Sequence, residues 1–347
     1  MEWQSSIVPG YSPDGKPIIS VIAKRTYLLS QNRVIIADDQ VSIQSSDIPS
    51  DPQNPLNCEM LYESDTVAYK PKTDVVVLCK AHAPNGKPVR MLETAVSIGP
   101  LVKKILTFGN RKIENRFMKG LTFTDPEPFT SIDISYSNAY GGRAVMRDGS
   151  IVPYPPNPLG KGFHFKGTLE DADQIQVPNC EDINSQLQPE HLLITKYEEW
   201  KNLPVPASYG WTRQFFFPRY TYAGIIPEML SGTTEKAPDL NTNTPKMDFR
   251  FYQGASEGMG AFLQNGNEPV KLIGMDPEYP VFEFKLPCDV PKISLCIGDE
   301  KIPLQPQLQT VFIDKESGGM ILVWRGFKEG SLMNFAERGR VLSSLVE

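Results

Sequence analysis

The chain has 347 residues, of which 40% are hydrophobic and 22% are charged, and its formal net charge is −6. This composition is typical of a folded globular protein, long enough for one large domain or two ordinary ones, and excludes a disordered chain. The acidic balance argues against nucleic acid as the main ligand, because binding phosphates requires concentrated Lys and Arg.

The N-terminal segment and the cysteines indicate the compartment. Residues 1–6 contain no basic stretch followed by an apolar one, which argues against a signal peptide. No apolar run approaches the roughly 20 residues that a membrane helix needs. The five cysteines are odd in number and form no Cys-x-x-Cys pair, so neither a disulfide framework nor a zinc site is indicated. We therefore expect a cytoplasmic protein without membrane contact, with five reduced and mostly buried thiols.

Proline and glycine punctuate nearly the whole chain, with 31 and 26 residues respectively. Long helices cannot run uninterrupted through such a sequence. The pattern predicts a mainly β fold with little helix. We expect short antiparallel strands in sandwich-like or barrel-like sheets, together with a long proline-rich loop region.

Residues 1–120 predict an N-terminal β-rich subdomain that forms a meander. Its expected strands are Ile18–Leu29, Arg33–Ile36, Thr73–Cys79, Met91–Ile98, Lys103–Phe108 and Ile113–Phe117. The pair Asn85-Gly86 is a strong hairpin signal. We therefore expect the Thr73–Cys79 strand to turn there and to return as the Met91–Ile98 strand.

Residues 121–245 predict a loop-rich middle region, because prolines crowd it and regular patterns are sparse. Its best helix candidate is Pro189–Trp200, where the proline suits a first helical turn. A loop-rich stretch of this length is unusual in a compact domain and usually has a function.

Residues 246–347 predict a C-terminal β-rich subdomain. The expected strands are Asp248–Tyr252, Val270–Met275, Val281–Leu286, Ile293–Ile297, Thr310–Ile313 and Met320–Trp324. The tail Ser331–Leu345 is a weakly amphipathic helix candidate. We expect the three parts to form one compact unit overall.

The sharpest enzyme-like motif is Gly254-Ala255-Ser256-Glu257-Gly258, which matches the G-x-S-x-G nucleophile elbow. Such an elbow must open a helix, and its histidine follows the serine in the hydrolase order. Here the following segment is glycine-rich, and the three histidines all precede Ser256. We therefore interpret the motif as a loop that needs small residues.

Other chemical signals are equally weak. The histidines at positions 82, 164 and 191 lie far apart, and no phosphate-binding or dinucleotide-binding motif occurs. We assign no catalytic, cofactor-binding or metal-binding residue and expect no cofactor. The sequence leaves open whether two distant carboxylates meet across a cleft, as in a glycosidase.

The segment Trp211–Tyr222 concentrates aromatic residues and arginines, the residue types that anchor protein interfaces. A core strand is the alternative interpretation for at least half of it. If the segment were a regular strand, Arg213 and Arg219 would lie on one side, because alternate residues share a face. The candidate protein-binding residues are Trp211, Arg213, Phe215, Phe217, Arg219 and Tyr220.

An ordered series of motifs spans about Lys70 to Gly326 and so covers most of the chain. The motifs are Lys70–Val75, His82–Pro88, Phe108–Arg111, Tyr136–Gly142 (YSNAYGG), Tyr154–Phe163 (YPPNPLGKGF), Pro178–Glu181, Trp211 with Arg213, Phe249–Ala255 (FRFYQGA), Leu286-Pro287 and Leu322–Gly326. In this order they resemble the bacterial family called domain of unknown function 2169 (DUF2169), which accompanies type VI secretion genes.

The resemblance implies a non-catalytic accessory role. Proteins of this kind are expected to act as adaptors or chaperones that bind a toxic effector and help place it on the VgrG or PAAR spike. The family provides no established catalytic residue. The alternative is a hydrolase that acts on cell-wall or glycan substrates in the same secretion context.

Overall fold

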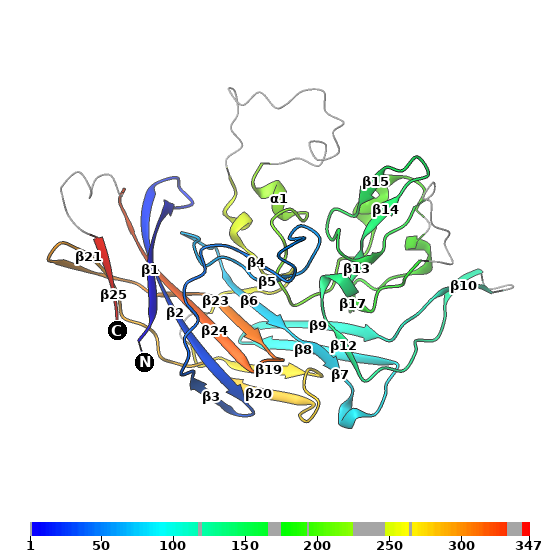
Figure 1. Cartoon of the computed structure of the whole chain (residues 1–347), viewed down its shortest axis with the longest axis horizontal. Coiled ribbons are helices and arrows are strands. Elements are labelled where there is room, and N and C mark those ends of the chain that lie inside the picture. Colours follow the sequence, from blue (N-terminus) through cyan, green and yellow to red (C-terminus); the bar gives the residue numbers. More distant parts are fainter. Residues whose placement is uncertain are drawn as a thin grey trace.

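The computed structural model describes residues 2–116, 120–165, 175–192, 194–224, 247–263, 266–331 and 342–347. Within these residues strands dominate and helices are short (Figure 1). The prediction of a mainly β fold is therefore confirmed. In this part of the chain, no helix is both long and apolar enough to cross a membrane.

The largest sheet joins strands from both ends of the sequence. In spatial order it contains β1 (Gln4–Tyr11), β2 (Pro17–Ser30), β24 (Gly319–Glu329), β23 (Gln307–Asp314), β6 (Thr73–Leu78) and β18 (Gly260–Ala261), with β3 (Arg33–Ile36) paired to β2. Neighbours pair antiparallel except β23 and β6, which are parallel. The N-terminal and C-terminal predicted subdomains thus share one sheet.

A second sheet has five antiparallel strands. Its spatial order is β17 (Cys180–Asp182), β9 (Leu101–Phe108), β8 (Met91–Ile98), β19 (Pro269–Ile273) and β20 (Val281–Lys285). Strand β17 belongs to the middle region, so this region is fastened to the sheet through hydrogen bonds to β9.

The main core lies between these two sheets, which makes the body a sandwich and not a barrel. Ile19, Val21 and Ala23 of β2 belong to a cluster that also contains Val96 of β8 and Leu272 of β19. Neighbouring residues in a strand point to opposite faces. The other face of the seven-stranded sheet is therefore also covered, and its cluster includes Ile22, Val76 and Trp211.

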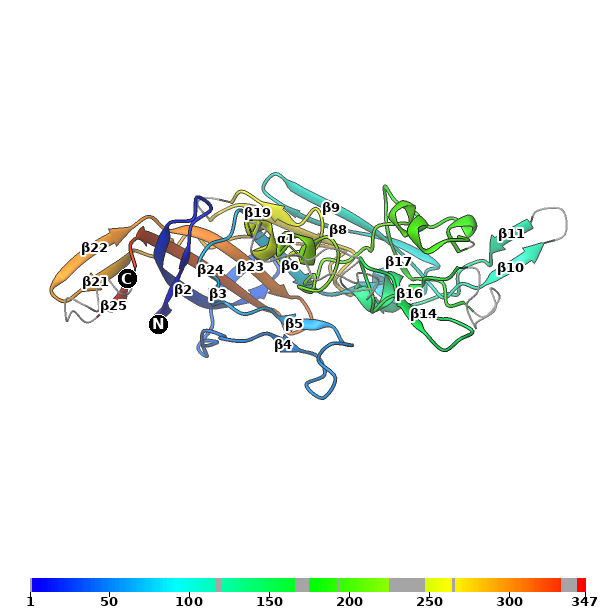
Figure 2. The same ribbon diagram turned by 90° about the horizontal axis from the view of Figure 1, so that it is seen from above.

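Smaller sheets extend the body at both ends. A three-stranded sheet of β22 (Glu300–Leu304), β21 (Ile293–Ile297) and β25 (Leu342–Val346) lies at the end that holds both termini (Figures 1 and 2). The hairpin of β10 (Ile113–Arg116) and β11 (Gly120–Phe123) projects at the opposite end (Figure 2).

The middle region has sparse regular structure, as its prolines predict. It contains the two-residue pair β13 (Tyr140–Gly141) and β16 (Lys161–Gly162) and the short hairpin β14 (Arg143–Val145) and β15 (Ile151–Pro153). Its own apolar cluster is rich in aromatic residues: Tyr140, Tyr154, Phe163, Phe165 and Trp200 are all buried.

Glycines permit the tight crossings of this region. Gly141 and Gly142 have φ values of 150° and 112°, in the range that favours glycine. A Cβ on Gly141 would lie 2.2 Å from the backbone oxygen of Asn157. The motifs that contain these glycines therefore fix the course of a long loop.

Two short pairs tie the remaining loops to the body. Strand β4 (Ile48–Pro49) pairs with β5 (Met60–Tyr62), and β7 (Lys80–His82) pairs with β12 (Ser131–Asp133). The predicted hairpin at Asn85-Gly86 is wrong: this pair lies in a short 3-10 turn, η1 (Pro84–Gly86). Strands β6 and β8 belong to different sheets, because β7 pairs with β12 and the chain then crosses to the other layer.

Three helix or strand assignments also differ. The predicted helix Pro189–Trp200 is replaced by two 3-10 helices, η4 (Pro189–Leu192) and η5 (Tyr197–Asn202), and the predicted strand Asp248–Tyr252 is the 3-10 helix η6 (Phe249–Tyr252). Most of the predicted tail helix lies outside the described residues. Its last residues form β25, whose pairing with β21 overrides a weak amphipathic pattern.

The expectation of mostly buried cysteines is only partly met. Cys79 and Cys180 are buried, Cys58 and Cys296 are half-buried, and Cys288 is exposed. None of the five forms a disulfide. Burial raises the pKa of the Cys180 thiol to about 12, so this thiol stays protonated and behaves as a small apolar residue.

Candidate binding pocket

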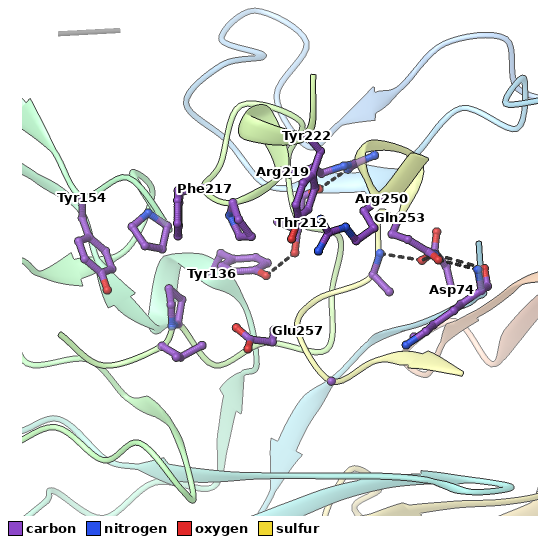
Figure 3. Close-up of a pocket in the computed structure, with 18 of the residues that line it drawn as sticks. Asp74, Tyr136, Tyr154, Thr212, Phe217, Arg219, Tyr222, Arg250, Gln253 and Glu257 are labelled. Atoms are coloured by element: carbon purple, nitrogen blue, oxygen red, sulfur yellow. Dashed lines mark hydrogen bonds between the residues drawn. The ribbon is translucent and has the colours of Figure 1, made fainter. Parts of the chain in front are cut away.

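A pocket of about 570 Å³ lies between the middle region and the edge of the sandwich (Figure 3). This volume falls within the range of roughly 300–1,000 Å³ that is usual for ligand pockets. Its aromatic, proline and charged lining residues are Tyr136, Tyr154, Trp200, Phe217, Tyr222, Pro71, Pro156, Pro206, Pro218, Lys72, Asp74, Lys201, Arg219, Arg250 and Glu257.

One end of the pocket is aromatic, with Tyr154 and Phe217 on the same side of Figure 3. The rings of Trp200 and Phe217 meet edge to face, with centroids 5.0 Å apart. The Tyr154 hydroxyl donates to the Pro204 carbonyl at 3.0 Å, which fixes its ring against the cluster. Because Tyr154 and Trp200 are buried in the core of the middle region, the aromatic wall is rigid.

The other end is polar and comes from β6 and the segment after η6. Asp74 is fully buried and accepts hydrogen bonds from Lys70 Nζ at 2.6 Å and from Gln253 Nε2 at 2.6 Å. The backbone N–H groups of Gly254 and Ala255 also donate to it, at 3.0 and 3.1 Å. With four donors, this carboxylate is committed to holding the 253–255 loop on the sheet.

Tyr136, Thr212 and Glu257 lie between the two ends (Figure 3). The Tyr136 hydroxyl and the Thr212 hydroxyl are 2.6 Å apart. Burial raises the pKa of Tyr136, so its hydroxyl is protonated at physiological pH. Glu257 is exposed and faces the pocket from the segment that follows Ser256.

A buried ion pair positions the wall beside the helix α1 (Arg219–Tyr222). The Arg219 guanidinium donates to the Glu63 carboxylate, to the Phe251 carbonyl at 2.7 Å and to the Thr212 carbonyl at 2.5 Å. Both charged side chains are nearly inaccessible to solvent. This arginine therefore links α1, η6 and the segment near β5 in one contact, since its planar head has five donors.

The six residues predicted for protein binding do not form one exposed surface. Trp211, Arg213, Arg219 and Tyr220 are buried, whereas Phe215 and Phe217 are half-buried. Of these six residues, only Phe217 and Arg219 line the pocket.

The strand geometry considered for this segment is wrong. Residues 212–218 form loops and turns before α1, so Arg213 and Arg219 do not share a strand face. Arg213 instead donates to the carbonyls of Cys58 and Pro55, at 3.0 and 2.5 Å. Both arginines therefore order loops by donating to backbone carbonyls.

The G-x-S-x-G motif forms a packed loop. Ser256 is 2% exposed and its hydroxyl donates to the Ser208 carbonyl at 2.6 Å. A Cβ on Gly254 would lie 2.0 Å from Glu63 Oε2 and 2.8 Å from the Trp211 ring. The small residues of this motif are therefore required for close packing.

A lysine, and not a histidine, approaches Ser256. Lys103 of β9 donates to Ser256 Oγ at 3.3 Å, to the Ser208 carbonyl at 2.9 Å and to the Glu257 carbonyl at 2.6 Å. Burial lowers the pKa of Lys103 to about 8. With three acceptors and little access to solvent, the ammonium joins β9 to two loops beneath the pocket.

The three histidines are engaged elsewhere. His82 Nε2 lies 3.3 Å from Glu316 Oε1. His164 Nδ1 lies 3.1 Å from the Leu192 carbonyl oxygen. His191 Nδ1 accepts from a backbone N–H at 3.0 Å.

Carboxylates and metal ligands do not converge at the pocket. Of the two carboxylates that line it, Asp74 is committed to its four donors, which leaves Glu257 alone. Nowhere in the described ranges do three or more His, Cys, Asp or Glu side chains come together so as to hold a metal ion. The lining therefore offers shape, aromatic surface and charge.

Sequence reasoning missed most of the residues that shape the pocket. Tyr136 and Tyr154 lie within the motifs YSNAYGG and YPPNPLGKGF, for which the sequence alone indicated no binding role. Lys72, Arg250 and Gln253 also lie within motifs of the ordered series. The sequence marked these residues as members of the motif series, but it did not show that the motifs meet around one cavity.

Fold and site together define a two-sheet β-sandwich whose loop-rich middle region builds a binding pocket against the sheet edge. Residues 14–325 match the family model described as an uncharacterized protein conserved in bacteria, DUF2169. The chain belongs to this family. No curated protein and no solved structure matches it.

Proposed function

We propose that this protein is a non-catalytic adaptor or chaperone of the bacterial cytoplasm. In this proposal it binds a toxic effector and helps load it on the VgrG or PAAR spike of a type VI secretion apparatus. The observation that carries the proposal is the pocket of about 570 Å³ between two regions of the chain. Its rigid aromatic wall is the kind of surface that anchors a partner's side chains.

The use of buried charge supports binding over catalysis. A catalytic site needs ionisable groups aimed at a reacting atom. Around this pocket Asp74, Lys103 and Arg219 are instead committed to internal carbonyl, carboxylate or N–H partners. These groups keep the pocket's shape, which is what a selective binding surface requires.

The secretion context comes from the motif series, whose family accompanies type VI secretion genes. Residues Lys72, Tyr136, Tyr154 and Arg250 of that series line the pocket. We therefore place the effector's docking site at this pocket and not over the whole Trp211–Tyr222 segment.

The test is capture of the effector from the native bacterium with a tagged chain, followed by mass spectrometry. Glu257→Trp would fill the middle of the pocket from an exposed position, whereas Glu278→Trp makes the same change at an exposed site outside the lining. We expect the wild type and Glu278→Trp to retain a secreted effector, and Glu257→Trp to lose at least nine-tenths of it.

Two results would reject parts of this proposal. Equal capture by both tryptophan variants would move the docking site away from the pocket. Wild-type protein that captures no effector, but hydrolyses peptidoglycan or another glycan, would replace the adaptor function by the hydrolase alternative.

A further inference from the structure

The two ends of the pocket differ in chemistry, so a ligand that fills it must carry two different groups. Tyr154 and Phe217 mark the aromatic end, and Arg250 and Gln253 mark the polar end (Figure 3). An apolar ligand would satisfy the first end and leave the second solvated. The occupant must therefore combine a large apolar group with a polar one.

The polar end presents positive charge. Lys72 is exposed, and its ammonium lies 5.6 Å from the centroid of the exposed Phe262 ring. No described carboxylate forms an ion pair with it. Arg250 is also exposed, and it pairs with Asp248 at 2.5 Å. Asp74 already has four internal donors, and Glu257, the other carboxylate of the lining, forms no ion pair with Lys72. Lys72 can therefore attract an external anion.

This local charge is opposite to that of the whole chain, which carries a formal net charge of −6. An acidic partner would be repelled by the net charge of the chain and attracted at Lys72. Opposite local potentials of this kind fix the register of a complex and reject wrong partners. The positive end thus favours an acidic group on the occupant.

The size of the pocket favours an extended segment. An α-helix with its side chains is about 10–12 Å wide, so the pocket would hold roughly one turn of it. In an extended chain, residues i and i+2 point to the same side about 7 Å apart. Such a segment can place side chains at successive points along the pocket.

We propose that the pocket binds an extended acidic segment of a partner protein. The segment carries a large aromatic or apolar side chain for the end at Tyr154 and Phe217, and an Asp or Glu further along for Lys72. This inference rests on the proposed adaptor function, because it names the chemistry that the effector would present.

The probes are two fluorescein-labelled pools of ten-residue peptides. Both pools fix Trp at one position, place either Glu or Lys at one of the following positions, and vary the others. Fluorescence anisotropy gives a pooled apparent Kd for each. We expect wild-type protein to bind the Glu pool at least tenfold more tightly than the Lys pool.

Charge variants test whether Lys72 is responsible. Lys72→Gln should remove the preference for the Glu pool, and Lys72→Glu should reverse it. Lys87→Glu makes the same charge change at an exposed lysine of the η1 turn, outside the pocket lining, and should leave the preference unchanged. Melting temperatures within about 2 °C of wild type show that the variants fold.

Equal binding of both pools by wild type, or an unchanged preference in Lys72→Gln, overturns this inference. If effector capture persists in that case, the adaptor function stands and only the acidic chemistry is rejected. A clear preference for the Glu pool with no effector captured from the bacterium rejects the adaptor function and supports the pocket's chemistry.

Discussion

The sandwich body and the loop-rich middle region of this protein are stabilised in different ways. In the body, long strands such as β2 and β24 pair over eleven residue positions, and apolar side chains fill both faces. In the middle region strands are two or three residues long. There, single buried side chains with several donors take the place of ladder hydrogen bonds.

Buried amide and guanidinium groups show this second strategy. Asn157 is fully buried and donates to the carbonyls of Tyr136 and Tyr140, at 2.7 and 3.0 Å. Arg111 donates to the Pro178 carbonyl at 2.6 Å and to the Glu181 carboxylate. A loop without a ladder must still satisfy its buried carbonyls. A few buried polar side chains therefore order the long irregular middle region, where the body relies on strand pairing.

The substitution Arg219→Met most strongly tests whether buried polar side chains stabilise the middle region. The change leaves the Glu63 carboxylate buried beside Lys70 at 3.7 Å without its closest partner. Breaking a buried ion pair on one side costs about 3–5 kcal/mol. We expect a loss of this size in the free energy of unfolding, measured by denaturant titration.

A second substitution checks the cause. In the double variant Arg219→Met/Glu63→Gln the uncompensated charge is gone, so part of the lost stability should return. A loss below about 1 kcal/mol in the single variant would mean that the middle region does not depend on this arginine.

Lys103 of β9 connects the sandwich body to the loops beneath the pocket, and its contribution to stability should depend on pH. The expected effect is smaller than that of Arg219→Met. The pKa of Lys103 is about 8 in the folded chain and 10.5 ordinarily. Between these values the unfolded chain binds more protons at this site, so folding becomes more favourable as pH rises. The unfolding free energy of wild type minus that of Lys103→Met should increase by up to about 3 kcal/mol from pH 8 to 10.5.

Lys87→Met serves as the exposed control for this series. The difference between wild type and this variant should stay flat over the same pH range. If the stability difference between wild type and Lys103→Met also does not change with pH, water reaches the Lys103 ammonium and this contact between body and loops is not closed.

The smallest expected effect is that of Asn157→Ala. It removes the side-chain donor to the carbonyls of Tyr136 and Tyr140, and only the Tyr136 carbonyl keeps a second donor, the Ala139 N–H at 3.2 Å. The expected cost is about 1–3 kcal/mol. Asn184→Ala, at an exposed position of the same region, should stay within about 0.5 kcal/mol of wild type. Similar melting temperatures for both variants would argue that the YSNAYGG loop is ordered by its backbone alone.

Local signals in the sequence predicted the body well. The β-branched run Thr73–Cys79 and the segment Ile18–Leu29 are strands because such residues pack well on a buried sheet. The prolines predicted where regular structure would be sparse. The hairpin at Asn85-Gly86 failed because β7 pairs with β12, and the pairing of distant strands is not encoded in a two-residue turn.

The sequence by itself determined the mainly β class, most strands of the body and membership in the motif series that marks the family. Only the tertiary structure decided which segments meet. The Trp211–Tyr222 segment has the composition of an interface, yet it places Arg213 and Arg219 on buried carbonyls. Composition reports what a side chain can do, whereas burial and partners decide what it does. The pocket therefore emerged only when segments up to about 190 residues apart, from Pro71 to Gly260, were brought together.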